Sequence, residues 1–353
     1  MPPSAASTPA AANPLVIRFG AVGDMIMTTP LLRALAERHG RPCDVIGRGR
    51  WLPLLLRHLP FVGTVHCVDS LRLPHWLEPS KQAITRWLRQ RADGPVYLLQ
   101  GDPLTQAMAR RGGLTVTADN DALPRRALEH TCDRHRRLAG FPAATYRLEA
   151  ELAVSAGELA ECQRWLAGLG MVGVPLVLIQ AGNRKTRSWR MSATERKHWP
   201  VASWAGVARG VLAAMPDARV LLIGAPKEQP LARAIAHQVG SARVLALADQ
   251  LPLRRLFALQ RLAHSLISVD TGPAHAAAAL GCPAVVLFGH TDPRITGPRA
   301  GTGPVRTVHP PGAPALDADA PWPRDGSLAG ITPQQVVACW EEVASAMPAF
   351  HTG

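Results

Sequence analysis

Short apolar runs alternate with helical patterns along nearly the whole chain, and this alternation is the feature that most restricts the fold. The apolar segment LVIRFG precedes a helical stretch in which Leu31, Leu32 and Leu35 share one face. CDVIG, which begins at Cys43, then starts the next strand. A strand, a helix and another strand in this order form a β-α-β unit with parallel strands. The alternation therefore predicts an α/β protein whose parallel sheets are covered by helices.

The second half of the sequence repeats this alternation after a break at 172–175. The strand LVLIQAG restarts the pattern, and a helix is predicted from Gln229 to Val239. A chain of 353 residues is long enough for two domains of roughly 150 residues each. We expect a disordered tail at 1–13, an N-terminal domain at 14–172, a C-terminal domain at 173–332 and a final helix within 333–353.

The stretch SVDTGPAHAAAALGCPAVVLFG, residues 268 to 289, contains a candidate ligand site. An apolar run ends at Asp270, the pair Gly272-Pro273 breaks it, and alanines, the strongest helix formers, follow. In open parallel sheets, ligands lie beyond the carboxyl ends of strands, where helix N-termini offer backbone N–H groups to anions. Asp270, Thr271 and Gly272 occupy that position. A simple helix cap formed by Asp270 and Thr271 is the structural alternative.

The charge balance restricts the partners of the protein. The formal net charge is +13, from 39 Lys and Arg against 26 Asp and Glu, which favours anionic ligands or surfaces. The basic residues are spread over both halves, and the sequence contains no RNA-binding motif with interleaved aromatic residues. We therefore expect no nucleic-acid partner.

Cysteine spacing and hydropathy restrict the cellular environment. The six cysteines form neither C-x-x-C pairs nor clusters with histidine, which argues against a zinc site and a disulfide framework. No apolar run approaches the roughly 20 residues of a membrane-spanning helix. The start MPPSAASTPAAANP lacks the basic region and apolar core of a secretion signal. These features favour a cytoplasmic protein with reduced cysteines.

Several ordered segments resemble one known family. FGAVGDMIMTTPLLRAL and VDTGPAHAAAALGCPAVVLFGHTDP are similar to the two signature regions of glycosyltransferase family 9, the ADP-heptose:lipopolysaccharide heptosyltransferases. KHWP (197–200), IGAPKE (223–228) and ITPQQVVACW (331–340) fall in the expected order between and after them. The resemblance covers nearly the whole chain beyond the tail. It implies a GT-B fold, in which two Rossmann-like domains face a central cleft and the final helix packs back toward the first domain.

The resemblance also implies an inverting transfer that needs no metal and no other cofactor. Such a transfer requires a base for the acceptor hydroxyl and a positive group for the departing nucleotide diphosphate. Asp24 matches the catalytic aspartate of the family's G-D motif, and Lys197 matches the lysine before W-P. Without the resemblance, Asp24 would be assigned as a carboxylate at a helix N-terminus and Lys197 as a solvated loop residue.

Five residues of the second half are expected to bind the donor. The resemblance implies that Asp270 hydrogen-bonds the donor sugar and that Thr271 and Gly272 contact its pyrophosphate. Glu228 ends the segment LLIGAPKE, where a carboxylate can accept hydrogen bonds from two ribose hydroxyls. His275 lies close to the same phosphates, and a structural hydrogen-bonding role is its alternative.

Basic residues supply further candidates for phosphate or acceptor contacts. The segment NRKTRSWRMSATERKHWP (183–200) is longer and more basic than the corresponding loop of typical heptosyltransferases. In the N-terminal domain, arginines are candidates for binding phosphates or acidic sugars of a lipopolysaccharide inner core. The candidates are Lys185, Arg187, Arg184 and Arg190 in the basic segment, and Arg57, Arg134, Arg136 and Arg137 in the N-terminal domain.

We therefore predict an inverting, metal-independent glycosyltransferase that moves a sugar, expected to be heptose from ADP-heptose, to a lipopolysaccharide or other cell-envelope saccharide. Its partners would be a nucleotide sugar and an anionic saccharide or glycolipid acceptor, with peripheral contact at the inner face of the cytoplasmic membrane. We expect a monomer. Two alternatives stay open: a nucleotide-sugar-binding protein without transfer activity, and a GT-B relative such as a sugar-nucleotide epimerase.

Overall fold

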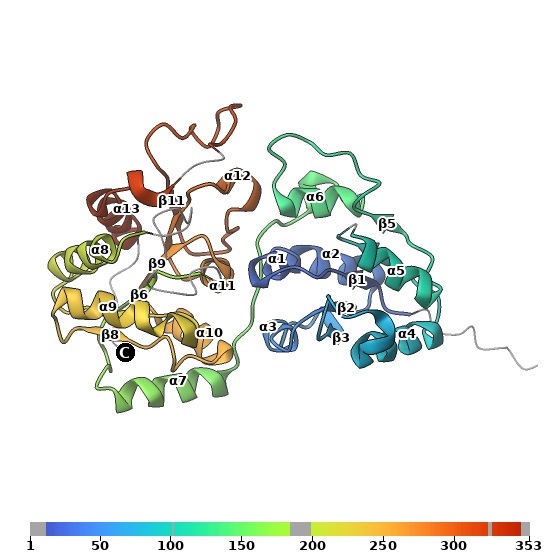
Figure 1. The fold of residues 1–353 in the computed structure, drawn as a ribbon, viewed down its shortest axis with the longest axis horizontal. Helices are drawn as coiled ribbons and strands as arrows, with labels where there is room; N and C mark the ends of the chain where they lie inside the picture. The colour runs from blue at the N-terminus through green and yellow to red at the C-terminus, as the bar shows by residue number, and fades with distance from the viewer. Residues whose placement is uncertain (1–11, 101, 184–198, 324–326, 347–353) are drawn as a thin grey trace, which may run out of the picture. The chain divides into compact units, whose positions relative to one another are not determined.

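The computed structural model describes residues 12–100, 102–183, 199–323 and 327–346. The chain forms two compact units, each containing one sheet and its helices (Figure 1). The N-terminal unit comprises residues 1–127 and 132–147, and the C-terminal unit comprises 128–131 and 148–353. Most of the tail expected at 1–13 lies outside the described residues.

The sheet of the N-terminal unit has five strands in the order β3-β2-β1-β4-β5, and all neighbouring strands run parallel. Strands β1 and β4 are buried throughout, as expected for a parallel sheet with helices on both faces. The elements are β1 (Leu15–Ile17), α1 (Val22–Ile26), α2 (Thr29–His39), β2 (Cys43–Arg48), α3 (Leu52–Leu55), β3 (Val62–Val68), the 3-10 helix η1 (His75–Leu77), α4 (Pro79–Gln90), β4 (Val96–Leu98), α5 (Pro103–Gly112), β5 (Ala118–Asp119), α6 (Thr131–Leu138) and the 3-10 helix η2 (Ala143–Thr145).

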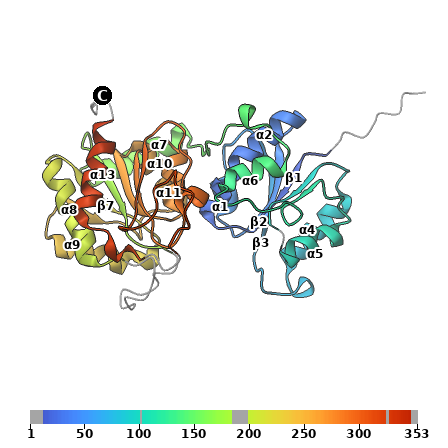
Figure 2. The same cartoon turned by 90° about the horizontal axis from the view of Figure 1, so that it is seen from above.

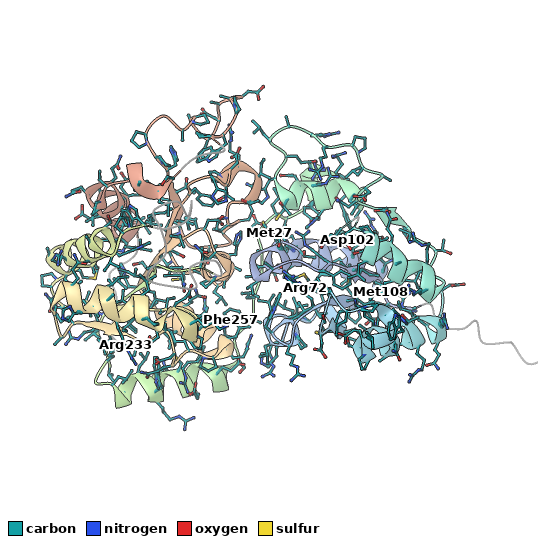
Figure 3. The ribbon with its side chains drawn as sticks, in the orientation of Figure 1. Met27, Arg72, Asp102, Met108, Arg233 and Phe257 are labelled. Atoms are coloured by element: carbon teal, nitrogen blue, oxygen red, sulfur yellow. The ribbon has the colours of Figure 1, made fainter. Side chains whose placement is uncertain are left out.

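Local sequence explains where these helices begin and how they are buried. The Asp102 side chain accepts hydrogen bonds from the backbone N–H groups of Leu104 and Thr105 at 2.9 and 3.0 Å, and it thereby caps α5. Met108, one turn further along α5, packs into the core formed with β1 and α4 (Figure 3 labels Asp102 and Met108). The buried face of α5 therefore packs on this core of the sheet.

The sheet of the C-terminal unit has six parallel strands in the order β11-β10-β9-β6-β7-β8. Its strands β6, β9 and β10 are buried throughout. The elements are α7 (Ala156–Gly168), β6 (Leu176–Gln180), α8 (Val201–Ala214), β7 (Arg219–Leu222), the 3-10 helix η3 (Pro226–Glu228), α9 (Gln229–Val239), β8 (Val244–Ala246), α10 (Leu253–Leu262), β9 (Ser265–Val269), α11 (Gly272–Ala279), β10 (Ala284–Leu287), α12 (Pro293–Thr296), β11 (Val305–Val308), the 3-10 helix η4 (Leu328–Gly330) and α13 (Pro333–Ser345).

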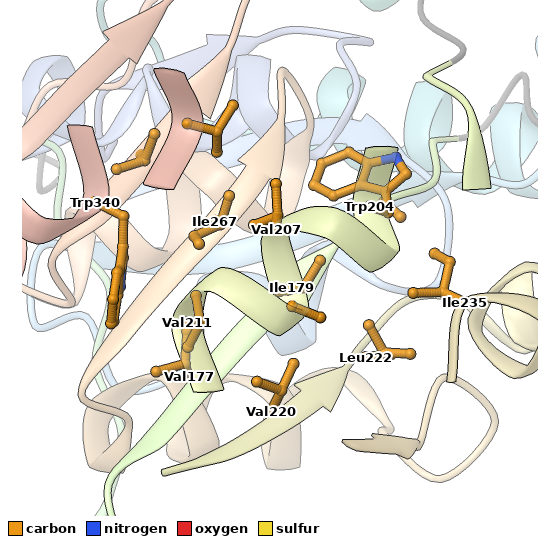
Figure 4. Close-up of a cluster of buried hydrophobic side chains, with 14 of the residues drawn as sticks. Val177, Ile179, Trp204, Val207, Val211, Val220, Leu222, Ile235, Ile267 and Trp340 are labelled. Carbon is orange, nitrogen blue, oxygen red and sulfur yellow. The ribbon is translucent and has the colours of Figure 1, made fainter. Parts of the chain in front are cut away.

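Alternate residues of each buried strand enter two separate cores, one on each face of this sheet. Val177 and Ile179 face the core that α8, α9 and α13 close, where Trp204 and Trp340 are buried (Figure 4). Leu178 faces the opposite core, which α7, α10 and α11 close. Figure 2 shows α8, α9 and α13 as a group on one side of the unit. The period-two pattern of a strand thus fills both cores.

Helix α7 differs from the sequence-based division of the chain. The sequence assigned α7 to an N-terminal domain ending at 172, but α7 packs against α10 in the C-terminal unit. Its Glu158 forms an ion pair with Arg254 at 2.5 Å, and burial of this contact fixes the helix to the second sheet. Helix α13 packs against α8, β10 and β11 of the same unit. The division therefore falls after Arg147. Packing of the final helix back toward the N-terminal domain stays a prediction.

The cysteines agree with the expectation of reduced, mostly buried thiols. The structure describes all six, none of which forms a disulfide, and four of them are buried. Burial raises the pKa of the Cys162 thiol to about 11, so this side chain behaves as a small apolar residue. In the part of the chain that the structure describes, no helix is both long and apolar enough to cross a bilayer.

Candidate functional site

Each sheet has one place where the strand order reverses, and these two switch points define the candidate site regions. In the N-terminal unit the reversal lies between β1 and β4, and in the C-terminal unit it lies between β6 and β9. Ligands of open α/β sheets bind at such places, beyond the carboxyl ends of the strands. Asp24 follows β1, and Asp270 follows β9. Two predicted site carboxylates therefore lie at the switch points of their own units.

Asp24 is the third residue of α1 and folds back on the loop that precedes this helix. Its Oδ2 accepts a hydrogen bond from the Ala21 backbone N–H at 2.8 Å, and its Oδ1 accepts one from Arg18 Nη2 at 3.1 Å. Gly20 allows this approach, because a Cβ there would lie 2.5 Å from the Asp24 Cβ. The Asp24 side chain is 40% exposed. Asp24 therefore fills the structural role at the helix N-terminus while its carboxylate stays open to solvent.

Arg18 fixes the position of this carboxylate from the interior of the unit. Only 11% of the Arg18 side chain is exposed, and its Nη1 donates a hydrogen bond to Nε2 of His135 in α6. Because a guanidinium can only donate, Nε2 of His135 is the acceptor in this contact. Sequence analysis missed both residues. Arg18 lies two residues before Gly20 and close to the G-D motif, and this proximity in sequence could have identified it as a site residue.

Asp270 links the carboxyl ends of two neighbouring strands in the C-terminal unit. Its Oδ2 accepts a hydrogen bond at 2.8 Å from the Thr291 hydroxyl, in the loop that follows β10. Its Oδ1 lies 3.9 Å from Nε2 of His275, and only 12% of the Asp270 side chain is exposed. His275 is buried beside it in α11. Thr291 belongs to the segment HTDP and was not predicted as a site residue, but the structure brings it to the predicted site.

Thr271 precedes α11, but its side chain does not cap this helix. The Thr271 Oγ1 lies instead 3.3 Å from the hydroxyl of Ser268. The capping alternative is therefore wrong for the side chain of Thr271. The alanine-rich face of α11 is buried and packs closely on β9 and β10, as the small side chains predict.

Glu228 occupies a buried position between the loops that follow β6 and β7. Its Oε2 accepts hydrogen bonds from the Ala225 backbone N–H at 2.7 Å and from Gln180 Nε2 at 3.1 Å. A Cβ at Gly182 or Gly224 would lie 2.5 or 2.7 Å from the carboxylate oxygens, so both glycines permit its position. Burial raises the pKa of Glu228, and the two hydrogen bonds oppose this rise. Gln180 was not predicted, and it connects the switch point to this carboxylate.

The arginines of α6 hold neighbouring loops. Arg137 Nη2 donates to the carbonyl oxygen of Pro124 at 2.6 Å, and Arg134 Nε donates to Asn120 Oδ1 at 2.7 Å. Arg136 donates to a backbone carbonyl at 2.8 Å, and Arg57 is exposed near α3. Their contacts with an acceptor stay predictions. The remaining basic candidates lie outside the described residues: Arg184, Lys185, Arg187, Arg190 and Lys197.

The side chains that commonly bind metals are dispersed. Within the described ranges, no three His, Cys, Asp or Glu side chains gather closely enough to hold a metal ion. The site regions consist of carboxylates with hydroxyl, amide and arginine partners, which suit hydrogen bonding to a sugar and a phosphate.

Two Rossmann-like units, each with a polar switch point, define a protein of the GT-B fold class. The sequence pattern of glycosyltransferase family 9 (heptosyltransferase) matches residues 104–309, which is more than half of the chain. The chain belongs to glycosyltransferase family 9, and this confirms the family inferred from the sequence motifs.

Individual relatives agree with this assignment. Lipopolysaccharide heptosyltransferase 1 of Salmonella typhimurium is 34% identical over 110 residues, covering 30% of this chain and 33% of that protein. The match thus spans about a third of the length of that curated relative.

Solved structures share the fold over nearly the whole chain. The family 9 glycosyltransferase of Veillonella parvula has a TM-score of 0.75 at 18% identity, with 95% of this chain and 98% of that chain covered. Escherichia coli ADP-heptose LPS heptosyltransferase II has a TM-score of 0.70 at 21% identity, with 94% and 98% covered. The iron-containing dodecameric glycosyltransferase TibC of enterotoxigenic Escherichia coli has a TM-score of 0.56 at 14% identity, with 96% and 77% covered.

Proposed function

We propose that this protein is an inverting glycosyltransferase that moves heptose from ADP-heptose to a lipopolysaccharide or related cell-envelope saccharide. Membership of family 9 supports the class of reaction. The observation that carries the proposal is the contrast between an open carboxylate, Asp24, and an enclosed one, Asp270, at the two switch points. The first suits proton transfer, and the second suits binding of a fixed ligand.

Asp24 is the base in this proposal. The acceptor hydroxyl oxygen forms a bond to the anomeric carbon while the bond from this carbon to the diphosphate oxygen breaks, and the hydroxyl proton passes to the Asp24 carboxylate. The diphosphate leaves with the bonding electron pair, and attack from the opposite face inverts the anomeric centre. Arg18 and the Ala21 N–H hold the carboxylate in place, and its exposed part is free to meet the acceptor.

The C-terminal unit holds the donor in this proposal. The N-terminus of α11, which the Thr271 side chain does not cap, supplies backbone N–H groups and the positive end of a helix dipole for the diphosphate. Asp270, which Thr291 fixes, accepts hydrogen bonds from the donor sugar. Glu228 accepts hydrogen bonds from the ribose, and Lys197 places a positive charge on the departing diphosphate. The reaction then needs no bound metal.

The donor and acceptor classes follow from the relatives and from the charge of the chain. The Escherichia coli relative is described as an ADP-heptose LPS heptosyltransferase, which supports heptose on an adenine nucleotide. A net charge of +13 suits an anionic saccharide or glycolipid acceptor. We place the reaction at the cytoplasmic side of the membrane, where the protein works as a monomer.

Acceptor-dependent release of ADP tests the proposal. The purified full chain is incubated with ADP-heptose, with and without heptose-free lipooligosaccharide, and ADP is measured over time. We expect ADP release only when the acceptor is present, with the same rate after addition of EDTA. Conversion of the donor into an isomeric nucleotide sugar would support an epimerase instead, and donor binding without turnover would support a binding protein. Loss of activity in EDTA would contradict the metal-independent mechanism.

A further inference from the structure

The segment between β3 and α4 exposes an unusual group of apolar side chains. Leu73, Trp76 and Leu77 are 44%, 72% and 50% exposed, and they are three of the six large apolar residues that are exposed in the described part of the chain. By contrast, tryptophans such as Trp204 and Trp340 are buried in the cores. Three neighbouring exposed apolar residues on one short segment indicate an interaction surface.

Hydrogen bonds fasten the backbone of this segment to α4. Lys81 Nζ donates to the carbonyl oxygens of Leu71 and Leu73 at 3.2 and 2.5 Å. Gln82 Nε2 donates to the carbonyl oxygens of His75 and Trp76 at 3.2 and 2.8 Å. Figure 2 shows the segment projecting from the unit between β3 and α4. Four backbone carbonyl groups of the segment are therefore hydrogen-bonded by α4 side chains, while Leu73, Trp76 and Leu77 are exposed.

Positively charged side chains lie within this segment and near its His75. Arg72 lies within the segment and is exposed (Figure 3 labels it). Burial, followed by the nearby positive charges of Arg111, Lys81 and Arg89, lowers the pKa of His75. The two acidic residues of this region are engaged locally: the Glu78 carboxylate accepts from Ser80, and Asp69 lies 3.8 Å from Arg50. The further exposed arginines of α4 and α5 are Arg86, Arg89, Arg110 and Arg111.

We propose that segment 72–77 docks the N-terminal unit on a lipid bilayer that carries anionic headgroups. Leu73, Trp76 and Leu77 enter the interfacial region, where tryptophan is favoured, and the surrounding arginines bind headgroup phosphates. The hydrogen bonds from Lys81 and Gln82 lower the cost of bringing this backbone into a less polar environment. The combination of apolar tip and basic surroundings distinguishes a lipid surface from a purely apolar protein partner.

The location of the segment adds a functional consequence. It follows β3, whose carboxyl end lies at the same edge of the sheet as that of β1, two strands away. Asp24 follows β1 at that edge. A bilayer contacted at this edge would bring a lipid-anchored acceptor to the part of the unit that carries the proposed base. The docking itself does not depend on sugar transfer.

Vesicle flotation with the full chain tests the docking. We expect the wild type to float with vesicles of phosphatidylcholine and phosphatidylglycerol and to bind phosphatidylcholine vesicles alone more weakly. Combined substitution Leu73→Ser, Trp76→Ser and Leu77→Ser should weaken partitioning roughly a hundredfold, because apolar transfer of these side chains is lost. The matched control, Leu169→Ser, Val172→Ser and Leu316→Ser, replaces the other exposed large apolar residues and should bind as the wild type does.

Charge and oligomeric state provide two further readouts. Arg72→Gln with Arg86→Gln should weaken binding to the anionic vesicles about tenfold or more and should leave the thermal unfolding temperature unchanged. Flotation of the wild type that does not depend on the three apolar residues would overturn the proposal, as would the absence of binding to anionic vesicles. A wild-type dimer that the triple substitution dissociates would assign the surface to a second copy of the chain. Because flotation requires neither donor nor acceptor, its outcome is independent of the transferase activity.

Discussion

The switch points of the two units each hold an aspartate, but in different environments. Asp24 is 40% exposed and bonds to Arg18 and to its own helix N-terminus, whereas Asp270 is 12% exposed and bonds to Thr291. A base must exchange its proton with a changing set of substrate groups, so it needs an open face. A binding residue gains from fixed neighbours that hold its orientation. The contrast supports chemistry at the N-terminal unit and donor binding at the C-terminal unit.

The largest expected effect comes from removing the proposed base. Asp24→Asn keeps the shape of the side chain but removes its ability to take a proton, so kcat should fall by about 10²- to 10⁴-fold. Stabilisation of the protein by the donor should be unchanged. Asp93→Asn, which alters an exposed aspartate of the same unit, is the control. If Asp24→Asn instead raised the donor KM and left kcat unchanged, the roles of the two aspartates would have to be exchanged.

Two glycines that lie beside carboxylates test the difference between a buried site and an exposed one. Gly182→Ala should destabilise the protein by about 1–3 kcal/mol, because the new Cβ would lie 2.5 Å from Glu228 Oε1 in a buried setting. Gly20→Ala should displace the more exposed Asp24 and reduce kcat more than stability. Urea unfolding and initial rates measure both effects. Gly157→Ala in α7 has open space around its Cβ and should be neutral or stabilising by about 0.5–1 kcal/mol. Equal loss of stability at Gly20 and Gly182 would contradict the difference in environment.

A smaller effect should follow from loosening Asp24. Arg18→Gln removes the guanidinium that holds the Asp24 carboxylate and His135 together, and we expect kcat to fall about tenfold with the donor KM nearly unchanged. Arg18→Lys keeps the positive charge and should restore part of the rate, which a purely structural role would not require. A rise in the donor KM without a change in kcat would show that Arg18 does not position Asp24 for proton transfer.

The smallest expected effect is a pH dependence of stability at Glu228. Because burial raises its pKa in the folded state, folding favours the protonated carboxyl, and this contribution is complete below the ordinary value of 4.5. The contribution is lost as pH rises through the raised folded-state pKa. Between about pH 4 and pH 8, which spans the titration of a carboxyl group with a raised pKa, the unfolding free energy is measured for wild type and Glu228→Gln. The unfolding free energy of the wild type should fall relative to that of Glu228→Gln as pH rises. A difference that moves in the opposite direction would show that the hydrogen bonds from Ala225 and Gln180 outweigh burial.

Elements with strong local signals were predictable from the sequence. The helix expected at Gln229–Val239 has these bounds in the structure, because a proline in its first turn and a glycine after its end mark both termini. The strand, turn and helix around Asp270 also agree with the prediction, because apolar and alanine runs separate clearly at Gly272. Local pattern thus predicted the fold class and the strand, turn and helix that carry Asp270.

Contacts between distant segments could not be predicted in this way. Arg18 and His135 are 117 residues apart, and Asp270 and Thr291 are 21 residues apart, so no spacing rule connects them. The boundary at 172 failed for the same reason: periodicity identifies α7 as a helix, but only its contact with α10 assigns it to the second sheet. Tertiary packing decides such pairings, and one sequence does not encode them in a local pattern.

Binding of nucleotide sugars tests the central claim most directly. Thermal unfolding of wild type and Asp270→Ala is measured with ADP-heptose, ADP-glucose, UDP-sugars and GDP-sugars, since a ligand that binds the folded state raises the unfolding temperature. We predict that ADP-heptose stabilises the wild type and that Asp270→Ala, although folded, loses this shift. A shift from another nucleotide sugar with none from ADP-heptose would contradict the proposed donor, and an undiminished shift in Asp270→Ala would contradict the site.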